Sequence, residues 1–357
     1  MKIKRLVFFF PAMMILMFVI IGCNKKSDNS TPDERKKYAW IAGQMDSTGY
    51  GIILFSADIG ETWVRQGQGT SALKDIDVSD IWAVDENNVW AVCSANVILK
   101  TIDGGQTWTR VPAPVNKTST RLSAISIVNK TNIWISGSGG TVYNSKDNGT
   151  TWAVFDSAFF HYGLMQGIWA LSPHKVYVIG GVAKGRNMEG FISFTMDGGA
   201  TWDTVVPADD YNRNEWIGVT ASGNTIVVYG GKSHYMVSTD GGGSWKNDSV
   251  PAGGGGGGAD INHLVMLNSQ IWWGAFDMDH VYLSLDEGKI WTYQQTHQSG
   301  DFLMGIDAWD SQLAITVGET VSAVKRGPIL KTSDGGVNWV TIKICRSNLY
   351  KVTFIKK

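Results

Sequence analysis

One eight-residue pattern, [Ser/Thr]-x-Asp-x-Gly-x-x-Trp, recurs seven times and constrains the fold more than any other feature of this sequence. A pattern repeated at a regular spacing means that the chain builds one structural unit many times over. Consecutive aspartates of the pattern lie 43 to 50 residues apart. The sequence therefore predicts seven repeats of one unit. The seven copies occupy residues 56–63, 101–108, 145–152, 195–202, 238–245, 284–291 and 332–339.

Short runs rich in β-branched and aromatic residues precede each copy, as expected for strands. Around the third copy these runs are 122–129, 132–139, 141–147 and 151–155. The composition agrees with many strands and tight turns, because the chain has 42 Gly and 16 Trp but only 8 Pro. Four strands in a period of about 45 residues are typical of a β-propeller blade. We predict an all-β fold over residues 38–357, a seven-bladed propeller of four-stranded antiparallel blades.

The first repeat lacks its first strand, because the segment 38–43 corresponds to a second strand. A strand without a repeat of its own, 349–355, follows the last copy of the pattern. Pairing these two ends would close the ring and remove open sheet edges. We therefore expect the C-terminal strand 349–355 to complete blade 1.

The seven copies resemble the Asp-box, or bacterial neuraminidase repeat, family of β-propellers. In layout the chain is most similar to the photosystem II stability and assembly factor-like propellers, which act as assembly scaffolds. The resemblance implies that each box is the turn between the third and fourth strands of a blade. The box aspartates would then be structural, since Asp bonds nearby backbone N–H groups and Gly accepts a positive φ. These aspartates are Asp58, Asp103, Asp147, Asp197, Asp240, Asp286 and Asp334.

The N-terminus has the layout of an export signal. Three basic residues precede an apolar run that ends at Gly22, and Cys23 follows. This resembles a bacterial lipobox, so we expect 1–22 to be a lipoprotein signal peptide, Cys23 to be lipidated and 23–37 to be a flexible tether. An ordinary signal peptide or an anchor helix with a chance cysteine is the alternative. Asn24 is not the Asp of the inner-membrane retention signal, which favours the outer membrane of a bacterial envelope, on either side.

Two further cysteines, Cys93 and Cys345, lie 252 residues apart. A disulfide between them is one possibility in an exported domain. Two buried thiols fit better, because Cys93 falls in an inner strand and Cys345 beyond the last repeat.

The strand order places the first-to-second-strand loops and the Asp boxes on one face of the ring. The variable loops and the blade connections share the opposite face, where function tends to concentrate. One interpretation of this face is a shallow central cleft that binds a sugar or a peptide, and the alternative is a solvated loop surface without a small ligand. The Asp277-x-Asp279-His280 run is interpreted as a polar loop rather than a metal site. We therefore expect no metal and no cofactor. The candidate ligand-binding residues are Tyr162, Arg186, Asp210, Tyr211, Arg213, Glu215, Trp216, His263, Asp279, His280 and Asp301.

Two functions fit this pattern. The first is a non-catalytic, monomeric scaffold that binds a glycan or a protein partner and is held at a membrane through Cys23. The second is a glycoside hydrolase, for which Asp209, Asp210, Glu215 and Asp301 would supply the two carboxyl groups. The arginine motif that precedes the first box in Asp-box sialidases is missing here, which favours the scaffold. Nucleic acid is not expected as a partner, because 31 Lys and Arg are balanced by 32 Asp and Glu.

Overall fold

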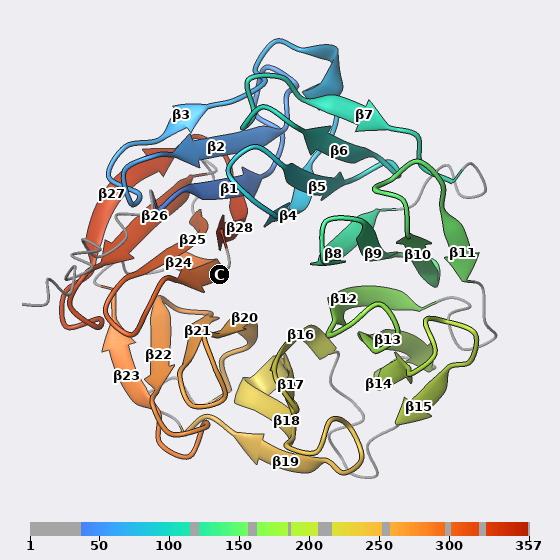
Figure 1. The fold of residues 1–357 in the computed structure, drawn as a ribbon. Helices are drawn as coiled ribbons and strands as arrows, with labels where there is room; N and C mark the ends of the chain where they lie inside the picture. The colour runs from blue at the N-terminus through green and yellow to red at the C-terminus, as the bar shows by residue number, and fades with distance from the viewer. Residues whose placement is uncertain are drawn as a thin grey trace, which may run out of the picture. The chain divides into compact units, whose positions relative to one another are not determined.

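A computed structural model describes residues 37–114, 121–155, 163–184, 187–205, 216–251, 258–296, 301–320 and 326–355. Seven four-stranded antiparallel sheets follow one another around a ring (Figure 1). The first strand of each sheet faces the centre and contacts the first strands of both neighbouring sheets. This confirms the predicted seven-bladed β-propeller.

The strands of blades 1 to 3 are given from the centre of the ring outward. Blade 1 has β28 (Leu349–Phe354), β1 (Ala39–Gly43), β2 (Ile52–Ser56) and β3 (Val64–Arg65). Blade 2 has β4 (Val78–Ala83), β5 (Val89–Cys93), β6 (Ile98–Thr101) and β7 (Thr109–Val111). Blade 3 has β8 (Leu122–Val128), β9 (Asn132–Gly137), β10 (Thr141–Ser145) and β11 (Ala153–Phe155).

Blades 4 to 7 repeat this order. Blade 4 has β12 (Leu164–Ala170), β13 (Val176–Lys184), β14 (Asn187–Thr195) and β15 (Asp203–Val205). Blade 5 has β16 (Trp216–Ser222), β17 (Thr225–Gly230), β18 (His234–Ser238) and β19 (Lys246–Ser249). Blade 6 has β20 (Ile261–Met266), β21 (Trp272–Phe276), β22 (His280–Ser284) and β23 (Thr292–Gln295). Blade 7 has β24 (Asp301–Ala308), β25 (Ala314–Thr320), β26 (Gly327–Thr332) and β27 (Val340–Cys345).

Two short 3₁₀ helices, η1 (Ser71–Leu73) and η3 (Gly231–Ser233), complete the elements of the described residues. In this part of the chain no helix has the length and apolar character needed to cross a membrane.

The ring is closed by the C-terminal strand. β28 pairs antiparallel with β1, with Val352 opposite Ile41 and Phe354 opposite Ala39. Leu349, Val352 and Phe354 are at most 1% exposed, in a cluster shared with blade 7. The expected completion of blade 1 by the tail of the chain is therefore confirmed.

The core consists of seven apolar clusters, and each lies between two neighbouring blades. A propeller blade is apolar on both faces, so its stability depends on the blades beside it. Box residues contribute to these interfaces: Gln66 of blade 1 donates to Gly104 O in the box of blade 2 and accepts from Trp108 Nε1. Gln294 of blade 6 makes the same two bonds to Gly335 O and Trp339 in blade 7.

The Asp boxes are turns between the third and fourth strands, as the resemblance implies. In the first box, Asp58 accepts from Ser56 Oγ at 2.8 Å and from the backbone N and Oγ1 of Thr62 at 2.9 and 2.6 Å. Gly60 has a φ of 79° and donates its N–H to Ser56 Oγ. The remaining six boxes repeat the two bonds from the Ser or Thr and from the backbone N–H four residues after the Asp.

Both remaining cysteines are free thiols. Cys93 is fully buried in β5, whereas Cys345, at the end of β27, is only partly buried. Two unpaired thiols were expected, but complete burial holds for Cys93 alone.

Candidate functional site

Two opposite faces of the ring can be distinguished from backbone contacts. In blade 2 the box residue Gly104 donates its N–H to Asn87 O, in the loop between β4 and β5. Equivalent bonds join the box to the first loop in blades 3 to 7, for example from Gly198 to His174 O. We call this side the box face, and the side from which the first strands begin the opposite face.

All seven first strands carry a β-bulge at the same point, where one extra residue enters the strand. In β4, for example, Val78 pairs with Cys93 and Asp80 pairs with Val92, which leaves Ser79 unpaired between them. A bulge changes which residues of the strand face the same way, so one residue per blade is presented at the same level. We call these seven the channel ring: Asp80, Ala124, Gly167, Gly218, His263, Gly305 and Lys351.

The first strands surround a cavity of about 150 Å³, and six of the seven channel-ring residues line it. Ser79, Ser123, Gln166 and Asn262 precede the channel ring in their strands and line the cavity toward the opposite face. Two residues further toward the box face, Trp82 and Trp169 pack edge to face with ring centroids 5.6 Å apart. The cavity therefore has four polar residues at one end, together with Ile217, Met304 and Tyr350 at the same position of the other strands, and two indoles at the other end.

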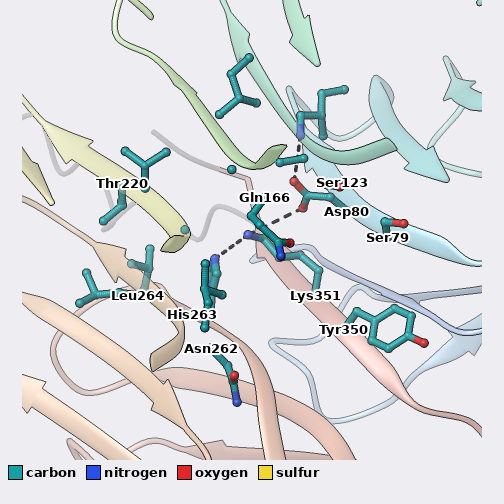
Figure 2. A pocket seen from close by; sticks show the side chains of 18 of the residues that line it. Ser79, Asp80, Ser123, Gln166, Thr220, Asn262, His263, Leu264, Tyr350 and Lys351 are labelled. Atoms are coloured by element: carbon teal, nitrogen blue, oxygen red, sulfur yellow. Dashed lines mark hydrogen bonds and ion pairs between the residues drawn. The ribbon is translucent and has the colours of Figure 1, made fainter. Parts of the chain in front are cut away.

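Three side chains of the channel ring meet inside this cavity (Figure 2). The ammonium of Lys351 donates to Nε2 of His263 and lies 3.7 Å from Oδ1 of Asp80. We call Asp80, His263 and Lys351 the channel cluster. They come from blades 2, 6 and 1, so a residue of the closing strand β28 connects two other blades.

The protonation of His263 follows from its partners. Lys351 has only donors, so Nε2 accepts from it, and the proton of the neutral ring is assigned to Nδ1, which lies 2.8 Å from the carbonyl oxygen of Ile306. The imidazole is neutral in this arrangement, and the channel cluster holds one positive and one negative charge.

Asp80 is 6% exposed, and its oxygens accept from backbone N–H groups of two blades. Oδ1 accepts from Ile81 N at 2.8 Å and Oδ2 from Ile125 N at 3.0 Å. Burial raises the pKa of Asp80, while the charge of Lys351 acts in the opposite direction. This carboxylate therefore joins blade 2 to blade 3.

Asp307 has the same role between blades 7 and 1. Its Oδ1 accepts from Ala308 N and its Oδ2 from Phe354 N, both at 2.8 Å. It is 2% exposed. Both carboxylates that line the cavity are thus held by the backbone of a neighbouring blade.

The residues proposed from the sequence divide into three groups. His263 lies in the channel ring, whereas Trp216 is 2% exposed and packs in the core between blades 4 and 5. Asp301 begins β24. Six more lie outside the described residues, as does Cys23: Tyr162, Arg186, Asp210, Tyr211, Arg213 and Glu215.

Asp279 and His280 are on the third strand of blade 6 and the turn before it. Asp279 has a φ of 63° in the turn between β21 and β22, and its carbonyl accepts from Thr296 Oγ1. His280 is 7% exposed and packs edge to face against Tyr282 and Tyr293. Burial lowers its pKa. Within the described ranges, no group of three or more His, Cys, Asp or Glu side chains is placed to hold a metal ion.

Sequence reasoning missed Asp80 and Lys351. Neither is among the residues predicted from the sequence, because the site was expected on the variable loops rather than on the inner strands. The available signal was the alignment of the seven first strands, in which charged residues occur in blades 1 and 2 where the other blades mostly have Gly or Ala.

Comparisons with known proteins agree with this architecture. Residues 68–210 match the family model described as photosynthesis system II assembly factor YCF48. A structure described as YCF48 bound to D1 peptide is 19% identical, with a TM-score of 0.61, over 78% of this chain and 86% of that one. YCF48 from Cyanidioschyzon merolae is 15% identical, with a TM-score of 0.58, over 78% of this chain and 92% of that one.

An enzyme has a similar fold. The GH74 xyloglucanase from Xanthomonas campestris is 13% identical, with a TM-score of 0.59, over 90% of this chain. This chain covers only 56% of the xyloglucanase. No curated protein sequence matches the chain. The protein is therefore a seven-bladed β-propeller whose blades carry Asp-box turns, and its segment 68–210 matches the YCF48 assembly-factor family model.

Proposed function

We propose that this protein is an exported, lipid-anchored scaffold that binds a protein partner at the channel and on the opposite face, without catalysing a reaction. The observation that carries this proposal is the state of the two cavity carboxylates. Asp80 and Asp307 each use both oxygens to accept backbone N–H groups. They hold the ring together, so neither is free to act on a substrate.

A glycoside hydrolase requires two carboxyl groups on either side of the scissile bond, one as acid and one as base or nucleophile. Among the described cavity-lining residues, Asp80 and Asp307 are the only acidic ones, and both have the structural role given above. The xyloglucanase supports a common fold and no more. The structure described as YCF48 bound to D1 peptide supports a peptide segment as the ligand of such a propeller.

The anchoring part of the proposal rests on the sequence. The basic residues, the apolar run and Cys23 at its end would give an acylated N-terminus, and acyl chains hold a protein at a membrane surface. A tether of 23–37 would let the propeller reach a partner near that membrane.

A peptide-display selection against the full-length protein tests the binding function. We expect enriched peptides to lose binding to a Ser123→Trp variant, because Ser123 lines the cavity toward the opposite face. Ser333→Trp is the matched control: Ser333 is exposed in the box of blade 7, where other boxes already carry Ile102, Met196 or Leu285. Equal binding to both variants would place the ligand elsewhere, and hydrolysis of xyloglucan by the same preparation would replace the scaffold with an enzyme.

A further inference from the structure

The channel cluster is electrically balanced. Lys351 and Asp80 carry opposite charges with Nζ and Oδ1 3.7 Å apart, and His263 is neutral in its hydrogen-bonding arrangement. A carboxylate brought to Lys351 would also approach Asp80, and an ammonium brought to Asp80 would also approach Lys351. Like charges at such distances repel strongly in a partly desolvated site. The cavity therefore disfavours charged groups of either sign.

The cluster nevertheless presents hydrogen-bonding capacity to the cavity. An ammonium has three N–H donors, and Lys351 directs one of them to His263, while Oδ1 of Asp80 lies 3.7 Å from the same nitrogen. Oδ2 of Asp80 accepts one N–H, from Ile125, and has a second lone pair. The side chains of Lys351 and Asp80 are 26% and 9% exposed, so both can be reached through the cavity.

A donor beside an acceptor is the complement of a carboxamide. A carboxamide carries a carbonyl oxygen that accepts and an NH₂ group that donates, on the same carbon. Its oxygen can accept from Lys351 while its nitrogen donates to Asp80. A hydroxyl can also accept from Lys351 and donate to Asp80, but only through a single oxygen. A carboxamide places its acceptor and its donor on two separate atoms, which can face the two groups side by side without adding charge.

The size and shape of the cavity fit such a group. At roughly 30 Å³ per water, 150 Å³ has room for about five water-sized groups. The small residue Ala124 lines this space, whereas the place beside Gly167 is filled by Ile179 and the place beside Gly218 by Tyr229. Trp82 and Trp169 limit its depth toward the box face. The space suits the end of one side chain rather than a threaded peptide.

We propose that the channel cavity binds a neutral carboxamide, supplied as an Asn or Gln side chain by the protein partner. This inference rests on the proposed binding function and adds the chemical class of group that the partner inserts. Lys351 and Asp80 recognise the amide, and Trp82 and Trp169 lie beyond it at the box-face end of the cavity.

Three probes of similar size test the chemistry directly: propionamide, propionate and propylammonium. The readout is the indole N–H signals of Trp82 and Trp169 in two-dimensional NMR spectra of the full-length protein, assigned with Trp82→Phe and Trp169→Phe. We expect propionamide to shift these signals with a millimolar Kd, and the two charged probes to bind at least fivefold more weakly. A larger response to propionate or propylammonium, or no response to any probe, would overturn the inference.

Two variants locate the site. Lys351→Met removes the donor, and Ala124→Leu fills the cavity while keeping the Lys351–Asp80 pair. Each should weaken propionamide binding at least tenfold, and Ala124→Leu carries the test if Lys351→Met does not fold. Lys246→Met, which removes an exposed lysine from β19, should bind as the unchanged protein does. Propionamide binding that survives Ala124→Leu would place the amide outside the cavity.

The failure of this inference is distinguishable from failure of the binding function. Display-selected peptides that depend on Ser123 but lack Asn and Gln would keep the scaffold and overturn the carboxamide. If propionamide binds in the cavity and no peptide is selected, the cavity chemistry stands and the peptide-binding function falls.

Discussion

Lys351 in the closing strand β28 donates to His263 of blade 6, although blade 7 lies between their two blades. Blade 7 has Gly305 at this level of the channel ring, so it adds no side chain there. A Cβ at Gly305 would lie 2.6 Å from the carbonyl oxygen of Tyr350, so the glycine also lets β24 and β28 approach each other. Ring closure and the channel cluster thus depend on the same strand.

The Lys351–Asp80 pair should show strong coupling. Asp80→Ala is expected to lower the free energy of unfolding by about 3–5 kcal/mol, because it leaves a partly buried ammonium without its carboxylate and Ile125 N–H without its acceptor. The double variant with Lys351→Met should lose less than the sum of the two single variants. Urea denaturation of the four proteins measures this difference, and additivity within about 0.5 kcal/mol would contradict the coupling.

Removal of residues 349–357 should prevent folding. Leu349, Val352 and Phe354 are buried at the interface with blade 7, and each buried side chain of this kind stabilises a protein by about 1.5–3 kcal/mol. Their sum is comparable with the whole stability of a typical domain, about 5–15 kcal/mol. Circular dichroism and gel filtration should show a poorly folded, aggregating protein. Removal of 356–357 alone is the control, and a folded, monomeric 1–348 chain would disprove ring closure as a requirement.

The Asp boxes should make stability depend on acid pH. Hydrogen bonds from Thr107, Thr151 and Thr201 lower the pKa of Asp103, Asp147 and Asp197 to about 2, from an ordinary value of 3.8. A carboxyl with a lowered pKa in the folded state stabilises that state above about pH 4 and loses this effect as the pH falls toward 2. Tm should therefore fall across this window.

Asp80 has a raised pKa, so it changes the pH dependence of stability in the opposite direction to the box aspartates. A comparison between variants is therefore needed to isolate the contribution of the boxes. Asp147→Asn should reduce the fall in Tm between pH 4 and pH 2. Asp203→Asn, which changes an exposed residue of β15 outside any box, should leave the fall unchanged. Thermal unfolding monitored by intrinsic fluorescence gives both slopes, and equal slopes would show that the box hydrogen bonds do not set the pKa.

The N-terminal cysteine should decide where the protein is found in a bacterial host. Cys23→Ala is expected to abolish incorporation of labelled palmitate and to move the protein from the membrane to the soluble fraction, since the acyl chains would be lost. Cys345→Ala should retain both properties. Palmitate labelling that persists in Cys23→Ala would exclude the lipobox interpretation.

Much of the fold followed from the sequence because the box is a local structure. The side-chain hydrogen bonds of Asp58 and Ser56 lie within the eight residues of the box, so the same sequence pattern gives the same hairpin turn in every blade. The unpaired strand 349–355 was recognised for a similar reason, since it had no box of its own. These features depend on short-range hydrogen bonds and on counting strands.

The channel cluster did not follow from the sequence because it depends on contacts between blades. Asp80 and Lys351 are 271 residues apart in the sequence. The bulges that turn their side chains into the cavity are not marked by any particular residue type. Alternation alone would place Val78 and Asp80 on one side of β4, yet the bulge sends Val78 into the core and Asp80 into the channel. His263 was included among the candidates because it is a titratable residue at the start of a strand.

A ring built from interchangeable repeats could in principle gain or lose one of them by duplication or deletion within the gene. The bond from Lys351 to His263 reaches over one blade, and Gly305 of that blade lets β24 and β28 lie close enough together. An extra repeat inserted between β20 and β28 would separate the two side chains, and a lost one would bring the wrong strand beside Lys351. The sequence of the inner strands therefore fixes the succession of blades from β20 to β28, even though the boxes on the rim do not.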